Sequence, residues 1–170
     1  MLSIWLIPQD PELGKLRLLI KRIADITGGP VFEPHITILA DIPLAPSEFA
    51  NRSASHFRAL PRLELTVGEI GTGTEYFKSL YLLTERSPLL NRIYDLASWQ
   101  LPSKARGDEF EPHVSLAYGD QPYRKHPQLI QIANESIPLR LRFSGISIVR
   151  AGKLVPVGKW RRRAVVGFDQ

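Results

Sequence analysis

The sequence contains no cysteine among its 170 residues. This absence excludes thiol nucleophiles, disulfide frameworks and metal sites built from thiolates. The chain also lacks an uninterrupted apolar run of about eighteen residues, the minimum for a membrane-spanning helix. Its first apolar stretch stops at Pro8 and has no basic residues before it, unlike a secretory signal peptide. We therefore expect a cytoplasmic protein with no membrane partner.

Motifs of several common enzyme classes are missing as well. The sequence has no GxSxG nucleophile motif, no glycine-rich phosphate-binding loop and no HExxH zinc motif. Low-complexity segments and linkers rich in glycine and serine are also absent. Hydrophobic residues make up 44% of the chain and charged residues 23%, which is ordinary for a globular protein. We expect a single domain over residues 1–170.

Positive charge is in excess, with a formal net charge of +5 and a pI near 9.7. Such a balance favours an anionic ligand, for example a nucleotide, an RNA end or a phosphorylated sugar. Basic side chains gather on one face of a predicted N-terminal helix, at Lys15, Arg17, Lys21 and Arg22. A second group is the run Arg161 to Arg163, which we interpret as a solvated, charged strand edge, with nucleic-acid binding as the alternative.

The pattern of apolar residues predicts alternating strands and helices. Strands are expected at 2–7, 36–40, 63–70, 76–84, 113–118, 137–149 and 160–168, and helices at 10–27, 47–57, 87–101 and 122–133. The residues Gly71 to Thr74 are expected to form the turn of a hairpin between the third and fourth strands. The order strand, helix, strand, helix, strand occurs twice and predicts an α+β fold of two similar, pseudo-symmetric lobes.

One short segment occurs twice in a chain that has only four histidines. FEPHITIL begins at Phe32, and FEPHVSLA begins at Phe110. In each copy the proline favours an extended residue before it, so that the histidine opens a strand. Side chains two residues apart on a strand point to the same face, which aligns His35 with Thr37 and His113 with Ser115. Each repeat therefore presents an imidazole beside a hydroxyl.

Two such pairs facing each other across a cleft between the lobes would suit a phosphate ester. Hydrolysis of a cyclic phosphodiester needs a base that activates water and an acid that protonates the leaving oxygen. Histidine performs either role near neutral pH. The hydroxyls of Thr37 and Ser115 would hold the non-bridging oxygens as their charge increases. The spacing does not decide which histidine is the base, although we favour His113.

Other interpretations remain open at this stage. A single histidine on a strand is more often a packed or surface residue than a catalyst, and we interpret His56 and His126 in this way. A metal site is a further alternative, because Glu33 and Glu111 would share a face with their histidines if the chain were extended. The histidines lack the spacing of known zinc motifs, so we favour a site without metal.

The paired His-Ile-Thr-Ile and His-Val-Ser-Leu motifs resemble those of the two-histidine (2H) phosphoesterases. The stretches SIWLIP, GTGTEYF, PHVSLAY and a late KW before an apolar strand are most similar to the cyclic phosphodiesterase branch. The resemblance covers Ser3 to about Phe168. It implies an antiparallel sheet in each lobe with helices outside, the motifs at 35–38 and 113–116 on central strands, and a cleft between the lobes. Plant members carry loop cysteines that this chain lacks.

The resemblance also implies a function and a set of site residues. The expected enzyme is a cyclic phosphodiesterase that acts without metal or cofactor on nucleoside 2′,3′-cyclic phosphates or on ADP-ribose 1″,2″-cyclic phosphate. The expected catalytic and phosphate-binding residues are His35, His113, Thr37 and Ser115, and the expected substrate-binding aromatics are Trp5, Tyr118, Tyr76 and Phe77. Two alternatives are an RNA 2′,3′-cyclic phosphodiesterase acting on RNA ends and a module that binds cyclic phosphates without cleaving them. We expect a monomer.

Overall fold

The computed structural model describes residues 1–99, 101, 110–120 and 123–169. The strands within these residues are β1 (Leu2–Leu6), β2 (Ile36–Ile42), β3 (Leu63–Glu75), β4 (Lys78–Thr84), β5 (His113–Ala117), β6 (Leu139–Phe143), β7 (Gly145–Arg150) and β8 (Arg161–Gly167). The helices are α1 (Glu12–Thr27), α2 (Pro46–Arg58), α3 (Pro88–Ser98) and α4 (Pro127–Asn134), with 3-10 turns η2 (Tyr123–Lys125) and η3 (Val157–Lys159).

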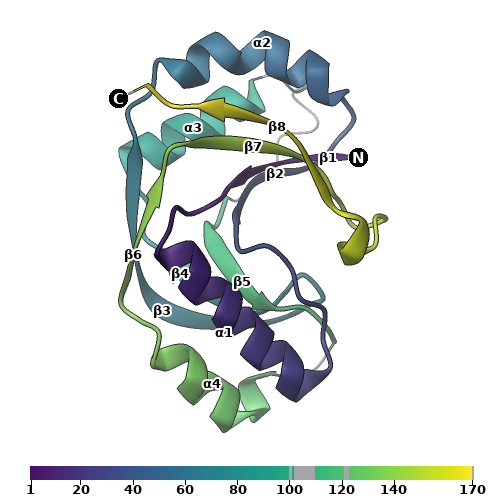
Figure 1. Cartoon of the computed structure of the whole chain (residues 1–170), viewed down its shortest axis with the longest axis vertical. Coiled ribbons are helices and arrows are strands. Elements are labelled where there is room, and N and C mark those ends of the chain that lie inside the picture. The colour runs from purple at the N-terminus through teal and green to yellow at the C-terminus, as the bar shows by residue number, and fades with distance from the viewer. Residues whose placement is uncertain (100, 102–109, 121–122, 170) are drawn as a thin grey trace.

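All of these strands join one antiparallel sheet in the order β6-β3-β4-β5-β2-β1-β7-β8. Helices α2 and α3 pack on the end of the sheet that contains β2, β7 and β8, whereas α1 and α4 pack on the end that contains β3, β5 and β6 (Figure 1). The prediction of an α+β fold with an antiparallel sheet and outer helices is therefore confirmed. The central pair, β2 and β5, carries the two repeated motifs.

Each half of the sheet combines segments that are distant in the sequence. Strands β1 and β2 pair with each other, and β1 also pairs with β7 from the C-terminal part of the chain. Strands β3 and β4 form a hairpin that pairs with β6 on one side and β5 on the other. The chain therefore passes repeatedly between the halves, which makes their relative position part of the fold.

Helix α1 follows the predicted apolar spacing. Its buried residues are Leu16, Leu19, Ile20, Ile23 and Ala24. It ends at Gly28, whose φ of 71° is readily adopted by glycine and whose N–H donates to the carbonyl of Ala24. Asp10, which precedes the helix, accepts through Oδ1 a bond from the N–H of Gly14 in the first turn, at 3.1 Å. No helix within the described residues has the length and apolar character to cross a membrane.

The predicted turn at Gly71 to Thr74 is wrong. These residues belong to β3, and the hairpin reverses at Tyr76 and Phe77. Glycine is needed at position 71 because the ring of Tyr81 on the paired strand lies over it: a Cβ there would be 2.2 Å from the ring. Gly71 marks the close approach of a side chain to the strand, and Gly73 that of the carbonyl oxygen of Lys78, so neither marks a reversal of the chain.

The predicted strand from 137 to 149 is also wrong, because it is divided at Ser144 into β6 and β7 at opposite ends of the sheet. Gly145 permits this crossing, since a Cβ there would lie 2.4 Å from the carbonyl oxygen of Val166 on β8. The helix predicted over 122–133 is instead η2 followed by α4, which begins at Pro127. Its predicted first residue, Pro122, and residue Gln100 of the preceding helix lie outside the described residues.

Candidate active site

The two repeated motifs are neighbours in the middle of the sheet. Ile36 of β2 pairs with Val114 of β5, and both side chains are fully buried in the core. Continuing this antiparallel register by one residue in each direction sets His35 opposite Ser115 and Thr37 opposite His113. The hydroxyl of each repeat thus faces the histidine of the other repeat.

The four residues line one cavity of about 200 Å³. Its wall consists of Ser3, Trp5, His35, Thr37, Ala40, Asp41, Glu75, Phe77, Lys78, His113, Ser115, Tyr118, Ala151, Gly152, Lys153 and Trp160. A larger surface groove of about 720 Å³ between β3, β4 and the segment before β5 contains neither histidine. The smaller cavity is the candidate site, because it combines two imidazoles, two hydroxyls and apolar walls.

The FEPH sequence fixes the orientation of both imidazoles by the same contact. Nδ1 of His35 lies 2.6 Å from the carbonyl oxygen of Glu33, and Nδ1 of His113 lies 2.8 Å from that of Glu111. A carbonyl oxygen only accepts hydrogen bonds, so Nδ1 carries the hydrogen in each ring. Nε2 is consequently the nitrogen that is left to exchange a proton with a ligand.

His35 lies in an aromatic and almost dry environment. Its side chain is 6% exposed and stacks on Trp5, with the ring centroids 3.6 Å apart and the planes 11° from parallel. Trp160 contacts the ring edge-on at 6.2 Å. Burial lowers the pKa of His35 to about 4, because the charged imidazolium loses hydration; the bond to the Glu33 carbonyl opposes this, and the proximity of His113 adds to it.

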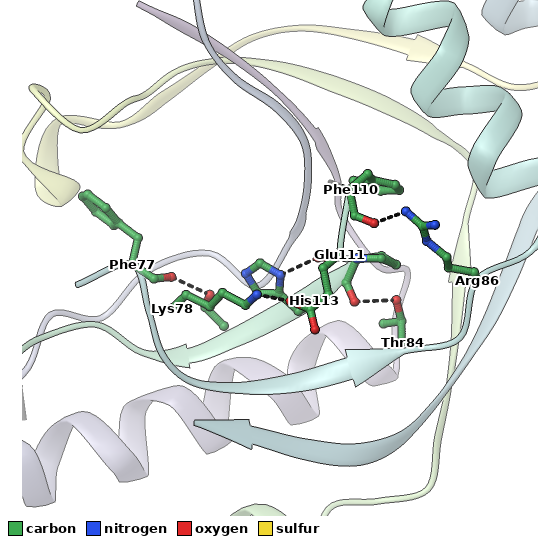
Figure 2. Close-up of polar contacts among 9 residues, drawn as sticks. Phe77, Lys78, Thr84, Arg86, Phe110, Glu111 and His113 are labelled. Atoms are coloured by element: carbon green, nitrogen blue, oxygen red, sulfur yellow. Dashed lines mark hydrogen bonds and ion pairs between the residues drawn. The ribbon is translucent and has the colours of Figure 1, made fainter. Parts of the chain in front are cut away.

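His113 lies beside charged groups, among them Lys78 and Glu111 (Figure 2). It is half-buried, and the ring of Tyr81 contacts it edge-on at 5.1 Å. Burial lowers the pKa of His113, and the bond to the Glu111 carbonyl opposes that effect. The charge of Lys78 lowers this pKa further, whereas the carboxylates of Glu111 and Glu75 raise it. Charged side chains therefore influence this histidine far more than they influence His35.

The two hydroxyls also differ. Ser115 is 6% exposed and donates to the carbonyl oxygen of Phe77 at 3.0 Å. It also interacts with the phenol of Tyr118, whose pKa is raised by burial. Thr37 is half-buried on the cavity wall. The hydrogen of Ser115 must turn away from the Phe77 carbonyl before this hydroxyl can donate to a ligand.

The family is decided by comparison with known proteins. Residues 1–140 match the model of the family described as "Cyclic phosphodiesterase-like protein". This chain belongs to that family. The prediction of a 2H, cyclic phosphodiesterase-like relationship is thus confirmed.

Relatives of this cyclic phosphodiesterase-like chain share little of its sequence. "Cyclic phosphodiesterase" from Arabidopsis thaliana is 24% identical over 118 residues, which are 69% of this chain and 65% of the relative. "2′,3′-cyclic-nucleotide 3′-phosphodiesterase" from Kluyveromyces lactis is 26% identical over 137 residues, covering 70% and 64%. The matched part thus spans slightly less than two thirds of these relatives.

A solved structure supports the fold. E. coli LigT in its apo form superposes with a TM-score of 0.64 and 13% identity, covering 99% of this chain and 97% of LigT. LigT has also been solved in complex with 3′-AMP, and that structure gives a TM-score of 0.60 at 15% identity, with coverage of 99% and 98%.

Four aromatic residues were expected to bind substrate in this cyclic phosphodiesterase-like chain, and three of them line the cavity. These are Trp5, Phe77 and Tyr118. Tyr76 is 41% exposed and lies outside the wall, where it contacts the ring of Phe77 edge-on at 4.8 Å. Phe77 approaches Trp160 at 6.0 Å. The turn between β3 and β4 therefore meets the segment before β8 beside the site.

Sequence reasoning missed several residues of the wall, chiefly Trp160, Lys78 and Lys153. Trp160 had been noted only as part of the family's late KW, and it reaches the site because its Nε1 donates to the Val155 carbonyl at 2.9 Å. Lys153 is placed by Asp41, whose Oδ1 accepts from the Lys153 N–H at 3.3 Å. No local signal marks these lysines, since their neighbours in space are remote in sequence.

The glutamates of the two FEPH segments are engaged with cations. Glu33 accepts two bonds from Arg17 of α1, at 3.0 and 2.5 Å, and Glu111 pairs with Lys78 of β4. Among the described residues, no group of three or more His, Cys, Asp or Glu side chains is arranged to hold a metal ion. His56 of α2 and His126 before α4 do not line the site.

Proposed function

We propose that the protein hydrolyses nucleoside 2′,3′-cyclic phosphates, or ADP-ribose 1″,2″-cyclic phosphate, to a phosphomonoester by acid–base catalysis with His35 and His113. The observation that carries the proposal is the pair of imidazoles on one small cavity, each held through Nδ1 by a backbone carbonyl. The names of the A. thaliana and K. lactis relatives support the same reaction. No metal is required by this mechanism, since water is activated by an imidazole.

In the proposed reaction one histidine removes a proton from water while the water oxygen bonds to phosphorus. The bond from phosphorus to one ring oxygen breaks on the opposite side, and the second histidine donates a proton to that oxygen. Thr37 and Ser115 hold the non-bridging oxygens. Each imidazole has changed its protonation state at the end of the step, and exchange with solvent restores both.

The environments favour His35 as the base, in place of His113, which we favoured from sequence. Burial against Trp5 keeps His35 neutral at pH 7, as a base must be. The pKa of His113 is lowered as well, chiefly by burial, but less than that of His35, and the carboxylates of Glu111 and Glu75 oppose the lowering, so His113 is the histidine that more readily carries the acid's proton. Bound phosphate strengthens the latter effect, because its negative charge lies beside the ring.

The first experiment follows a nucleoside 2′,3′-cyclic phosphate by phosphorus NMR in the presence of a chelator. The wild type should produce the 2′-phosphate, and His35→Ala and His113→Ala should each lower kcat by about 10²- to 10⁴-fold. His56→Ala, which changes a histidine outside the cavity, is the matched control and should keep the wild-type rate. Full activity in either cavity variant, or wild-type binding without cleavage, would contradict the proposal and favour a binding module.

RNA ends are the second candidate substrate because Arg161, Arg162 and Arg163 are all exposed along the edge strand β8. The basic face of α1 gives less support, since its cations are paired with carboxylates: Lys15 with Glu12, Arg17 with Glu33, Lys21 with Asp25 and Arg22 with Glu135. An oligonucleotide ending in a cyclic phosphate should lose affinity steeply with salt if β8 holds its backbone. A mononucleotide should lose little.

A further inference from the structure

Lys78 is a cationic side chain of the cavity wall that is paired with Glu111 of the second repeated segment. It is the first residue of β4, directly after the turn at Tyr76 and Phe77, and it lines the cavity wall. Its Nζ pairs with Glu111 (Figure 2). The same atom lies 5.0 Å from the centre of the Tyr81 ring, which contacts His113 edge-on. The Lys78 side chain is 25% exposed, so it is partly shielded from water.

The chemistry proposed for this site needs a fixed positive charge beside the non-bridging oxygens, because the charge on each histidine of the repeated motifs changes during the reaction. Negative charge is spread over the non-bridging oxygens of a phosphoryl group during transfer, and preorganised donors or cations stabilise it. The hydroxyl of Ser115 already donates to the carbonyl of Phe77. Within the described residues, the lysines and arginines on the cavity wall are Lys78 and Lys153.

Lys153 is less suited to the reacting phosphate. It lies on the segment after β7, where its backbone N–H is bound by Asp41 at the end of β2, and its side chain is exposed. Lys78, by contrast, is joined to the second motif through Glu111, whose carbonyl also holds Nδ1 of His113. Of the two wall lysines, Lys78 is thus the one that is linked by its contacts to the His113 motif.

We propose that Lys78 is a third catalytic group, which exchanges its contact with Glu111 for one with a non-bridging oxygen of the reacting phosphate. This inference rests on the proposed function. Before substrate binds, the pair with Glu111 holds the ammonium group on the wall beside His113, so little reorganisation is needed when the anion arrives. The amine remains protonated throughout and transfers no proton.

The first repeat provides an internal control, because its glutamate has a cationic partner outside the cavity. Arg17 pairs with Glu33, but its side chain is 50% exposed and does not line the cavity wall. Both cations bind the glutamate two residues before a histidine. Of these two cations, only Lys78 lies where a ligand in the cavity could contact it. If both ion pairs only supported the motifs, removing either cation should lower activity by a similar factor.

The test compares kcat and KM of Lys78→Gln, Lys78→Arg, Glu111→Gln and Arg17→Gln with cytidine 2′,3′-cyclic phosphate. Lys78→Gln should lower kcat/KM by about 10²- to 10³-fold, mainly through kcat, and Lys78→Arg should restore part of the loss. Arg17→Gln should stay within about twofold of the wild type. Glu111→Gln frees the lysine, so the decrease in kcat/KM in this variant should be at least about tenfold smaller than the decrease in Lys78→Gln.

Equal losses in Lys78→Gln and Glu111→Gln would overturn the inference, because they would show that the ion pair only positions the second motif. Wild-type kinetics in Lys78→Gln would overturn it as well. A second readout is the affinity for inorganic phosphate, measured by titration calorimetry, which Lys78→Gln should weaken about tenfold or more and Arg17→Gln should not change. Failure of the wild type to cleave any cyclic phosphate would contradict the proposed function, whereas unchanged phosphate affinity in Lys78→Gln would contradict the role of Lys78.

Discussion

The two repeated motifs share a backbone arrangement but place their histidines in different environments. In both, a carbonyl two residues earlier holds Nδ1, and the glutamate that supplies it pairs with a cation. His35 is stacked on Trp5 in a buried aromatic setting, whereas His113 is half-buried and surrounded by charged groups. The repeated backbone contact thus orients His35 and His113 in the same way, while their different neighbours give the two imidazoles different affinities for a proton.

This difference matters because an acid and a base must hold different numbers of protons at the same pH. Identical surroundings would place a single proton equally often on either imidazole, so only about half of the singly protonated molecules would have the acid and the base in the required positions. Burial lowers the pKa of both histidines, but at His113 the carboxylates of Glu111 and Glu75 oppose the lowering, and no carboxylate side chain of the described residues does so at His35. If the two environments act separately, a change beside one histidine should leave the pKa of the other unchanged.

The largest expected effect is on the pH dependence of stability. The pKa of His35 falls from 6.5 in the unfolded chain to about 4 in the folded protein, so the folded state binds fewer protons between these values. Stability from this group is complete above about pH 6.5 and is lost as the pH falls towards 4, by about 3 kcal/mol in total. Urea unfolding at pH 7.5 and pH 4 measures the change.

His35→Gln isolates this contribution, because glutamine does not titrate. The loss of stability between pH 7.5 and pH 4 should be smaller in the variant than in the wild type by about 3 kcal/mol. His56→Gln, at a histidine outside the site, should leave the difference unchanged. An identical pH dependence in His35→Gln and the wild type would show that burial does not perturb this histidine.

A smaller effect is expected from Gly71→Ala, which acts on the His113 side alone. The new methyl group would lie 2.2 Å from the Tyr81 ring and displace it from the edge of His113. We expect a loss of about 1 to 3 kcal/mol in unfolding free energy, with NMR shifts at His113 but not at His35. Gly68→Ala, on the same strand with nothing within 4 Å, is the control and should be nearly neutral. Equal costs would refute the packing argument.

Much of the fold and the centre of the site could be predicted because their signals are local. Strand alternation and the proline before each histidine place an imidazole and a hydroxyl on one face, and this spacing holds whichever strands become neighbours. The glycines at 71 and 73 misled the prediction for the opposite reason. Gly71 lies beneath the ring of Tyr81 and Gly73 lies against the carbonyl oxygen of Lys78, both on the paired strand, and a short glycine-rich stretch looks the same whether it turns or makes such close approaches.

The rest of the site depends on pairings between distant segments. Trp5 and Trp160 meet around His35 because β1 pairs with β7 and the segment before β8 folds back over it. Lys78 reaches Glu111 because β4 pairs with β5. Periodicity indicates that strands exist but does not give their order in the sheet. Trp160 and the two lysines were therefore the part of the wall that the sequence did not predict, whereas Trp5, Phe77 and Tyr118 were expected from the family resemblance.

The next prediction concerns the cause of the low pKa at His35. Trp5→Ala removes the stacked ring and admits water, so the pKa of His35 should rise from about 4 towards 6.5 by about one unit or more. Imidazole titration by NMR measures it directly. Tyr81→Ala is the matched change beside His113 and should leave the titration of His35 unchanged. A pKa of His35 that stays near 4 without Trp5 would assign the shift to other parts of the wall.

The smallest effect is expected from the two ion pairs when stability alone is measured. The Arg17 and Glu33 side chains are 50% and 32% exposed, and those of Lys78 and Glu111 are 25% and 52% exposed, so water screens both pairs. Arg17→Gln and Lys78→Gln should each cost about 0.2 to 1 kcal/mol in chemical unfolding, and less at high salt. Similar costs would mean that any difference between them in turnover arises from the position of Lys78 on the cavity wall. A cost several times larger for Lys78→Gln would instead indicate that this pair holds the second motif in place, and the two repeats would then differ in their support as well as in their surroundings.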